Sequence, residues 1–171
     1  ETELRLKSGT VYTTLAYSYY QAHGNQVPDY VVTANERILL GFPQHKLTGQ
    51  TVNLSVQQGD EIVYIDRAWS ERSGMQVVRA IGGRAPLHLT STGKLFLCAA
   101  DPRQVRAYAT RTGLAGNTRN SITQFDKLER ELALVRRHGY ARDNEELEMG
   151  VRCIAAGIYD DAGKLVAGLS I

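Results

Sequence analysis

Four acidic residues precede a cysteine near the C-terminal end of the chain, in the stretch RDNEELEMGVRC. A carboxylate and a thiol together could serve a hydrolase or hold a metal ion, provided that a histidine joins them. His88 is the histidine in the central part of the chain. One hypothesis is therefore a thiol- or metal-assisted hydrolase that uses Cys153, His88 and Asp143. The four acids are Asp143, Glu145, Glu146 and Glu148.

Each of these residues also has an ordinary structural interpretation. Cys153 heads an apolar run, where a buried, inert thiol is usual, and no CxxC or HxxxH spacing marks a metal site. His88 lies between two leucines in a strand-like stretch, which favours a hydrogen-bonded structural histidine. We expect Asp143 to project inward from a strand that begins shortly before it. Glu146 and Glu148 are expected to face water.

The segment HLTSTGKL has the Gly-Lys pair of a phosphate-binding loop. The Walker pattern requires a glycine five residues before its second glycine, and Ser or Thr after its lysine. These two places hold His88 and Leu95, so a nucleotide site of this kind is excluded. Thr90, Ser91 and Thr92 instead predict the start of a helix, where free N–H groups are either simply capped or able to bind an anion.

The composition describes a globular domain. Of 171 residues, 43% are hydrophobic and 22% are charged, which suffices for a core. The 20 basic and 18 acidic residues leave a net charge of +2, so the chain should not bind nucleic acid strongly by itself. No apolar run approaches the roughly 18 residues that span a bilayer. Two cysteines, Cys98 and Cys153, indicate reduced thiols in a cytoplasmic protein.

The elements that must position these residues are helices and strands in alternating groups, which predicts an α+β domain with a mostly antiparallel sheet. We expect helices over residues 11–21 and 34–42, the second with a capping box formed by Thr33 and Glu36. Further helices should start near Thr90, at Pro102 with Asp101 as N-cap, and at Ser121 with Gln124 as capping partner. The expected strands are 51–56, 61–66, 74–81, 152–159 and 164–171, with another beginning at Tyr140.

Two long, ordered blocks carry a family resemblance. GRAPLHLTSTGK and GYARDNEELEMGVRCIA resemble the C-terminal effector-binding domain of IclR-type bacterial transcriptional regulators. The resemblance covers residues 47–171. Residues 1–46 are interpreted as a linker or N-terminal helical segment that would join a winged helix-turn-helix, which this chain lacks. The chain starts without Met and stops within a predicted strand, so we expect a fragment without the family's C-terminal helices.

The resemblance implies a GAF-like α+β fold, with a curved antiparallel sheet, packed helices and a ligand pocket on the concave side. It implies no enzyme activity, no cofactor and no metal. The expected partners are a small organic acid as effector and operator DNA, the latter only through the missing N-terminal domain of a repressor or activator. Homodimers or homotetramers are usual in the family, and no membrane is involved.

Carried onto this chain, the resemblance assigns ligand-binding residues in three groups. Backbone N–H groups at a helix start bind the anion, polar side chains contact the rest of the ligand, and an apolar wall encloses it. Ser170 belongs to the second group, although strand alternation alone would place it in solvent. In that order the groups are Ser91 and Thr92; Asp143, Cys153 and Ser170; and Val77, Ala85 and Val151.

Overall fold

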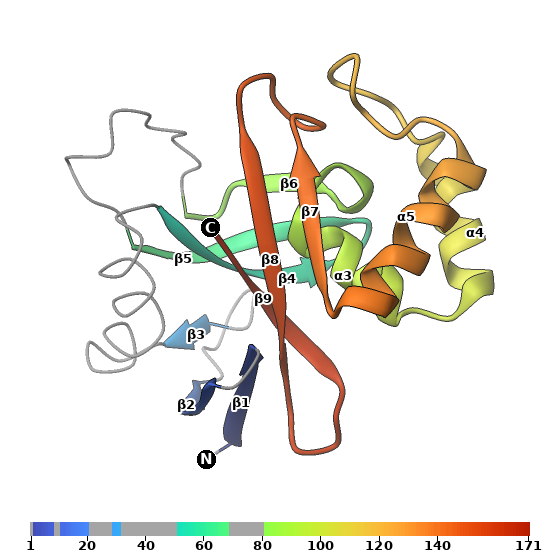
Figure 1. The fold of residues 1–171 in the computed structure, drawn as a ribbon. Coiled ribbons are helices and arrows are strands. Elements are labelled where there is room, and N and C mark those ends of the chain that lie inside the picture. The colour runs from blue at the N-terminus through green and yellow to red at the C-terminus, as the bar shows by residue number, and fades with distance from the viewer. Residues whose placement is uncertain (1, 9–10, 21–28, 32–50, 69–80) are drawn as a thin grey trace.

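A curved antiparallel sheet and three helices form the protein in the computed structural model (Figure 1). The structure describes residues 2–8, 11–20, 29–31, 51–68 and 81–171. The helices are α3 (Ser91–Ala99), α4 (Pro102–Thr112) and α5 (Phe125–His138), and a 3-10 turn, η1 (Leu87–Leu89), leads into α3. The strands are β1 (Thr2–Ser8), β2 (Val11–Tyr20), β3 (Asp29–Val31), β4 (Val52–Gln58), β5 (Glu61–Ala68), β6 (Arg84–Pro86), β7 (Tyr140–Asn144), β8 (Arg152–Tyr159) and β9 (Leu165–Ser170).

The strands pair in the order β3-β2-β1-β8-β9-β4-β5-β6, and β7 also pairs with β8. All of the described pairings are antiparallel. The long strands β8 and β9 cross the middle of the molecule, and α4 and α5 lie together beyond β7 (Figure 1). The predicted α+β class with a curved antiparallel sheet is confirmed.

Two buried apolar clusters lie on opposite faces of the sheet. The larger cluster joins the sheet to the helices, and the alternation of side chains along each strand puts its sheet members on one face. The smaller cluster uses the intervening residues of β4, β8 and β9. Representative members of the first are Ile62, Ala155, Phe96, Leu128 and Leu132; those of the second are Val52, Leu54, Ile158, Ala167 and Leu169.

The hairpin and the helix boundaries follow the local sequence signals closely. The predicted strands at 51–56 and 61–66 are β4 and β5, which pair as a hairpin with Gly59 at a positive φ in the turn. Asp101 caps α4 with a complete capping box, and Pro102 occupies the first turn, as predicted. Gly139 ends α5 in the left-handed conformation that glycine adopts readily.

The prediction that α5 begins at Ser121 is wrong. The helix begins at Phe125 with Gln124 as its N-cap, and Gln124 makes no side-chain capping bond. The Ser121 hydroxyl instead accepts two backbone N–H groups of its own loop, each at 2.9 Å, and donates to the Glu146 carbonyl at 2.6 Å. Ser121 therefore fixes the loop before α5 against the loop after β7.

The prediction of a helix over residues 11–21 is also wrong, because Val11–Tyr20 is strand β2. It pairs with β1 from Thr2↔Tyr17 to Ser8↔Val11. The segment contains four tyrosines, two threonines and one valine, and these residue types favour a pleated strand over a helix. The helix predicted at 34–42 and the strand predicted at 74–81 lie outside the described residues, apart from Ile81, which is in a turn.

None of the helices in the described part of the chain is long and apolar enough to cross a membrane.

Candidate ligand-binding site

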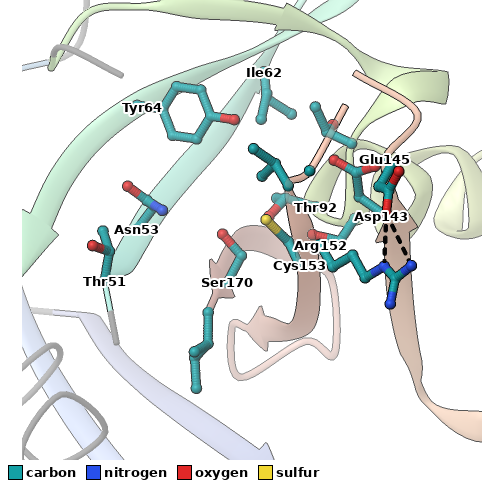
Figure 2. Close-up of a pocket in the computed structure, with 15 residues that line it drawn as sticks. Thr51, Asn53, Ile62, Tyr64, Thr92, Asp143, Glu145, Arg152, Cys153 and Ser170 are labelled. Atoms are coloured by element: carbon teal, nitrogen blue, oxygen red, sulfur yellow. Dashed lines mark hydrogen bonds and ion pairs between the residues drawn. The ribbon is translucent and has the colours of Figure 1, made fainter. Parts of the chain in front are cut away.

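A cavity of about 690 Å³ opens between the start of α3 and the face of the sheet that α3 covers. Its lining combines residues from α3, from both strands of the β4–β5 hairpin and from β8 and β9. Figure 2 shows Asn53 and Tyr64 on one side and Asp143 and Cys153 on the other, with Ser170 between them. Six of the residues predicted from the sequence line it, namely Ser91, Thr92, Asp143, Val151, Cys153 and Ser170.

Strand register brings the polar lining together. Asp143 and Cys153 are directly opposite each other in the β7–β8 pair, and Ser170 is opposite Asn53 in the β4–β9 pair. Residues that face each other across antiparallel strands project from the same side of the sheet. Ser170 is 5% exposed. The expectation from alternation alone, that it faces solvent, is wrong because α3 covers this side of the sheet.

The start of α3 supplies the donors of the cavity. The Thr90 side chain accepts the Gly93 N–H at 3.0 Å, and the Thr90 carbonyl accepts the Lys94 N–H. The N–H groups of Ser91 and Thr92, in the first turn, have no acceptor within the helix. Such groups carry the positive end of the helix dipole and favour an anion. Both residues line the cavity.

Gly93 explains the Gly-Lys pair without a nucleotide. A Cβ atom at position 93 would lie 2.2 Å from the Leu87 carbonyl oxygen, so only glycine lets α3 fold back on the preceding turn. Lys94 then points into the protein, where its side chain is 0% exposed. Both residues of the pair therefore have a structural role.

Lys94 holds the acidic loop in place. Its ammonium group lies 2.7 Å from the Glu146 carboxylate, 2.7 Å from the Arg142 carbonyl oxygen and 3.5 Å from Glu131. The expectation that Glu146 faces water is wrong, since it is only 6% exposed. Burial raises the pKa of Glu146, and the neighbouring Lys94 charge works in the opposite direction. Glu148, by contrast, is exposed as predicted.

Asp143 is buried, as predicted, and connects the cavity to this loop. One of its carboxylate oxygens accepts the Glu146 N–H at 2.8 Å. At the rim of the cavity, Arg152 reaches Glu145 at 2.9 Å in an ion pair (Figure 2). The acidic stretch thus supplies a cavity wall, a buried ion pair and a charged rim.

His88 belongs to a separate hydrogen-bonded site in the core. Its Nε2 lies 3.0 Å from the Ala115 carbonyl, which can only accept, so Nε2 carries the proton. Its Nδ1 therefore accepts from the Tyr108 hydroxyl at 2.6 Å, and that hydroxyl accepts the His88 backbone N–H at 3.1 Å. Burial lowers the pKa of His88 and raises the pKa of Tyr108 to about 12.

These contacts confirm the structural role predicted for His88, although it lies in the turn η1 and not in a strand. Both of its ring nitrogens are engaged, and it does not line the cavity that holds Cys153. The geometry therefore gives no support to the hydrolase hypothesis. Within residues 51–68 and 81–171, no three His, Cys, Asp or Glu side chains gather closely enough to hold a metal ion.

Two predicted wall residues stand apart from the cavity. Ala85 is buried in the larger core cluster and is not among the residues lining the cavity. Val77 lies outside the described residues. The wall facing β8 comes instead from the β4–β5 hairpin, whose residues were not predicted to belong to the site. Its residues are Thr51, Asn53, Ile62 and Tyr64, and their alternate spacing on two paired strands was the signal available.

The covered sheet, the helix start and the polar cavity define a small-molecule-binding domain of the GAF-like type. The family described as bacterial transcriptional regulator IclR C-terminal matches residues 43–171. The chain therefore belongs to the IclR family of bacterial transcriptional regulators, within which it is the effector-binding domain. This family consists of regulators and not of enzymes, in agreement with the resemblance and against the hydrolase hypothesis.

Individual relatives agree with this assignment. The regulator KdgR of Dickeya chrysanthemi is 38% identical over 125 residues, 73% of this chain and 41% of that protein. The crystal structure of Thermotoga maritima IclR is 38% identical with a TM-score of 0.71, over 76% of this chain and 52% of that one. The inducer-binding domain of a PobR double mutant from Acinetobacter, solved with 3-hydroxybenzoic acid, is 29% identical with a TM-score of 0.68, over 74% of each chain. This chain spans less than half the length of the curated relative.

Proposed function

We propose that this domain senses a small organic acid, and that occupancy of its cavity controls DNA binding by a winged helix-turn-helix in the full-length regulator. One observation carries the proposal. The first-turn N–H groups of Ser91 and Thr92 open on a cavity that also contains the Ser170 hydroxyl. A carboxylate placed there would receive several oriented donors at once.

The charges around the cavity favour a ligand whose negative group lies at the start of α3. Lys94 lies near the start of α3, but its ammonium group already donates hydrogen bonds to the Glu146 carboxylate and the Arg142 carbonyl. Asp143 would repel a carboxylate placed beside it and would accept a hydrogen bond from a hydroxyl of the ligand. The arrangement therefore orients an acid, with its carboxylate at α3 and its remainder toward β7 and β8.

A relative supports this choice of ligand. The PobR inducer-binding domain was solved with a hydroxybenzoic acid, which is a small carboxylic acid. A handful of hydrogen bonds, each contributing about 0.5–1.5 kcal/mol, gives micromolar to millimolar affinity. Affinity in this range suits a sensor of a metabolite.

The remaining features of the proposal concern the whole regulator. We place the effector-binding domain at residues 47–171 and assign residues 1–46 to the connection with the DNA-binding domain. The regulator would act in the cytoplasm, where its operator DNA is, and would bind that DNA as a homodimer or homotetramer.

A thermal-shift panel of small organic acids on the 171-residue chain tests the proposal. Each acid is paired with its own primary amide, which keeps the size and removes the negative charge. We expect at least one acid to raise the melting temperature in a concentration-dependent way, and its amide to have little effect. If no acid raises the melting temperature, or if amides act equally, the proposed ligand class is wrong.

A further inference from the structure

The loop after β7, residues 145–151, is held from two sides. On one side its N–H groups bond to residues that line the cavity. The Glu145 N–H donates to the Val151 carbonyl at 2.9 Å, and the Glu146 N–H donates to the Asp143 carboxylate at 2.8 Å. Glu145 lines the cavity as well. The position of this loop therefore decides where one wall of the cavity stands.

On its other side the loop after β7 offers carbonyl oxygens to the α4–α5 loop, residues 113–124. The Thr118 hydroxyl donates to the Glu145 carbonyl at 2.7 Å, and the Ser121 hydroxyl donates to the Glu146 carbonyl at 2.6 Å. A segment that has left its sheet needs donors for its carbonyl groups from elsewhere in the protein. Two hydroxyl groups of the α4–α5 loop supply them directly behind the cavity wall.

The α4–α5 loop is itself fixed to the core. Leu114 is 3% exposed and belongs to the larger apolar cluster. The Ala115 carbonyl accepts the Nε2 proton of His88 at 3.0 Å. The Ser121 oxygen also accepts two backbone N–H groups of its own loop, each at 2.9 Å. The hydroxyl groups behind the cavity wall thus project from a support that is anchored in the protein interior.

Both loops contain a residue in a strained backbone conformation. Among the described residues other than glycine, Leu114 and Glu145 have a positive φ, at 48° and 61°. Such a conformation persists in a residue with a side chain only where its surroundings hold it on several sides. Glu145 is held through its N–H, through its carbonyl by Thr118 and through its carboxylate by Arg152. Loss of the Thr118 hydroxyl would remove one of these three contacts.

We propose that Thr118 and Ser121 are positioning residues of the effector cavity, which act through the carbonyl groups of the loop after β7. They hold Asp143 and Glu145 in place without lining the cavity themselves. This inference rests on the proposed function, because it concerns the affinity of that cavity for its acid. Coupling between two sites is reciprocal, so a bound acid should in turn stabilise the α4–α5 loop.

Substitutions of Thr118 separate the effect of its hydroxyl from that of its shape. Thr118→Val removes the hydroxyl and keeps the branched side chain, whereas Thr118→Ser keeps the hydroxyl. Ser121→Ala tests the second contact independently. Thr110→Val is the matched control, because the Thr110 hydroxyl also donates to a backbone carbonyl, that of Arg106 at 3.0 Å, on the exposed side of α4.

Alkylation by iodoacetamide reports the state of the cavity wall in the absence of any acid. Cys153 lines the cavity opposite Asp143, whereas Cys98 lies outside it. We expect Thr118→Val and Ser121→Ala to speed the alkylation of Cys153 about threefold or more, as for the loss of one hydrogen bond, and to leave the Cys98 rate unchanged. Thr118→Ser and Thr110→Val should react like the parent chain.

Calorimetric titration measures the affinity, with the acid that raises the melting temperature most in the thermal-shift panel. We expect Thr118→Val to weaken its binding about three- to tenfold, and Thr118→Ser and Thr110→Val to stay within about twofold of the parent chain. Hydrogen exchange tests the reciprocal effect. The same acid should slow the exchange of the Asn117 and Thr118 amides, which bond to the Ser121 oxygen, and Ser121→Ala should abolish this protection.

The outcomes keep the two proposals apart. If Thr118→Val lowers the melting temperature but leaves the affinity or the Cys153 alkylation rate unchanged, the hydroxyl only stabilises the fold. The inference is then wrong and the proposed function stands. Equal behaviour of Thr118→Ser and Thr118→Val would also overturn the inference, because the hydroxyl would not be the cause. If no acid in the panel binds, the proposed function is wrong, and the alkylation rates alone decide whether the two hydroxyls position the wall.

Discussion

The ammonium group of Lys94 lies 2.7 Å from the carboxylate of Glu146, with both side chains buried. These residues are 52 positions apart in the chain, and their contact ties the start of α3 to the loop that follows β7. That loop carries Glu145 and leads through Gly150 and Val151 to Cys153, all of which line the cavity. The ion pair therefore positions one wall of the site without taking part in the wall itself.

Removing one partner of this pair should destabilise the protein strongly. Lys94→Met leaves the Glu146 carboxylate buried without its counter-charge, and such changes cost about 3–5 kcal/mol. Replacing both residues, as Lys94→Met with Glu146→Leu, should cost much less, because no charge stays buried. Chemical denaturation followed by circular dichroism measures both free energies of unfolding.

The exposed pair of Arg106 and Glu129, at 3.9 Å, is the matched control for this comparison. Glu129→Gln should change the free energy of unfolding by about 1 kcal/mol or less. Equal effects of Lys94→Met and Glu129→Gln would contradict the structural role that we assign to Lys94.

The stability of the protein should fall as the pH drops below the ordinary His88 value of 6.5. The folded protein holds His88 neutral, with its pKa lowered by burial, whereas the unfolded chain takes up the proton at the ordinary value. The unfolded state therefore binds more protons in this range, and stability is lost with falling pH by at most about 1.4 kcal/mol per pH unit. His88→Asn should flatten this dependence between pH 6.5 and pH 5.5.

Loss of the Tyr108 hydroxyl tests the same network at constant pH. Tyr108→Phe leaves Nδ1 and the backbone N–H of His88 without their partner. We expect a loss of about 1–3 kcal/mol at neutral pH, measured by urea denaturation. An unchanged free energy of unfolding in Tyr108→Phe would show that the buried hydroxyl contributes nothing to stability.

Gly168 and Thr92 should be energetically coupled. Gly168→Ala places a methyl group 2.3 Å from the Thr92 methyl carbon and should cost about 1–3 kcal/mol through overpacking. In a Thr92→Ser background that carbon is absent, and the nearest remaining Thr92 atoms are at 3.2 Å. A double-mutant cycle should therefore show that Thr92→Ser offsets part of the cost. Simple additivity would mean that α3 does not pack on this glycine.

Ligand should protect Cys153 from alkylation and leave Cys98 unaffected. Cys153 lines the cavity, whereas Cys98 packs on the core beside the Leu132 carbonyl, and burial raises the pKa of its thiol. We expect slow modification of both thiols by iodoacetamide at neutral pH, with Cys153 slowed further by a bound acid. Mass spectrometry of the two cysteine peptides measures the rates, with Cys98→Ala as the control for assignment. Fast alkylation of Cys153 would instead indicate an activated nucleophile.

Local patterns by themselves determined much of this protein. The hairpin of β4 and β5, the caps of α4 and the end of α5 follow from turn, capping and glycine signals, which act within a few residues. The ordered motifs around Gly93 and Cys153 also sufficed to indicate the family, and the resemblance named six of the 15 residues that line the cavity.

Tertiary structure decided the properties that depend on what covers a residue. Strand alternation places Ser170 on one side of β9, but only the packing of α3 on Gly168 makes that side the interior. From the local sequence Glu146 is expected to be a solvated acid, but in the fold it is buried and paired with Lys94 of α3. Ser121 resembles a helix cap, yet its hydroxyl donates to the Glu146 carbonyl in the loop that follows β7. The burial of a side chain and its bonding partners are set by contacts between segments that are distant in sequence. The local sequence around the side chain does not determine which distant segment packs against it.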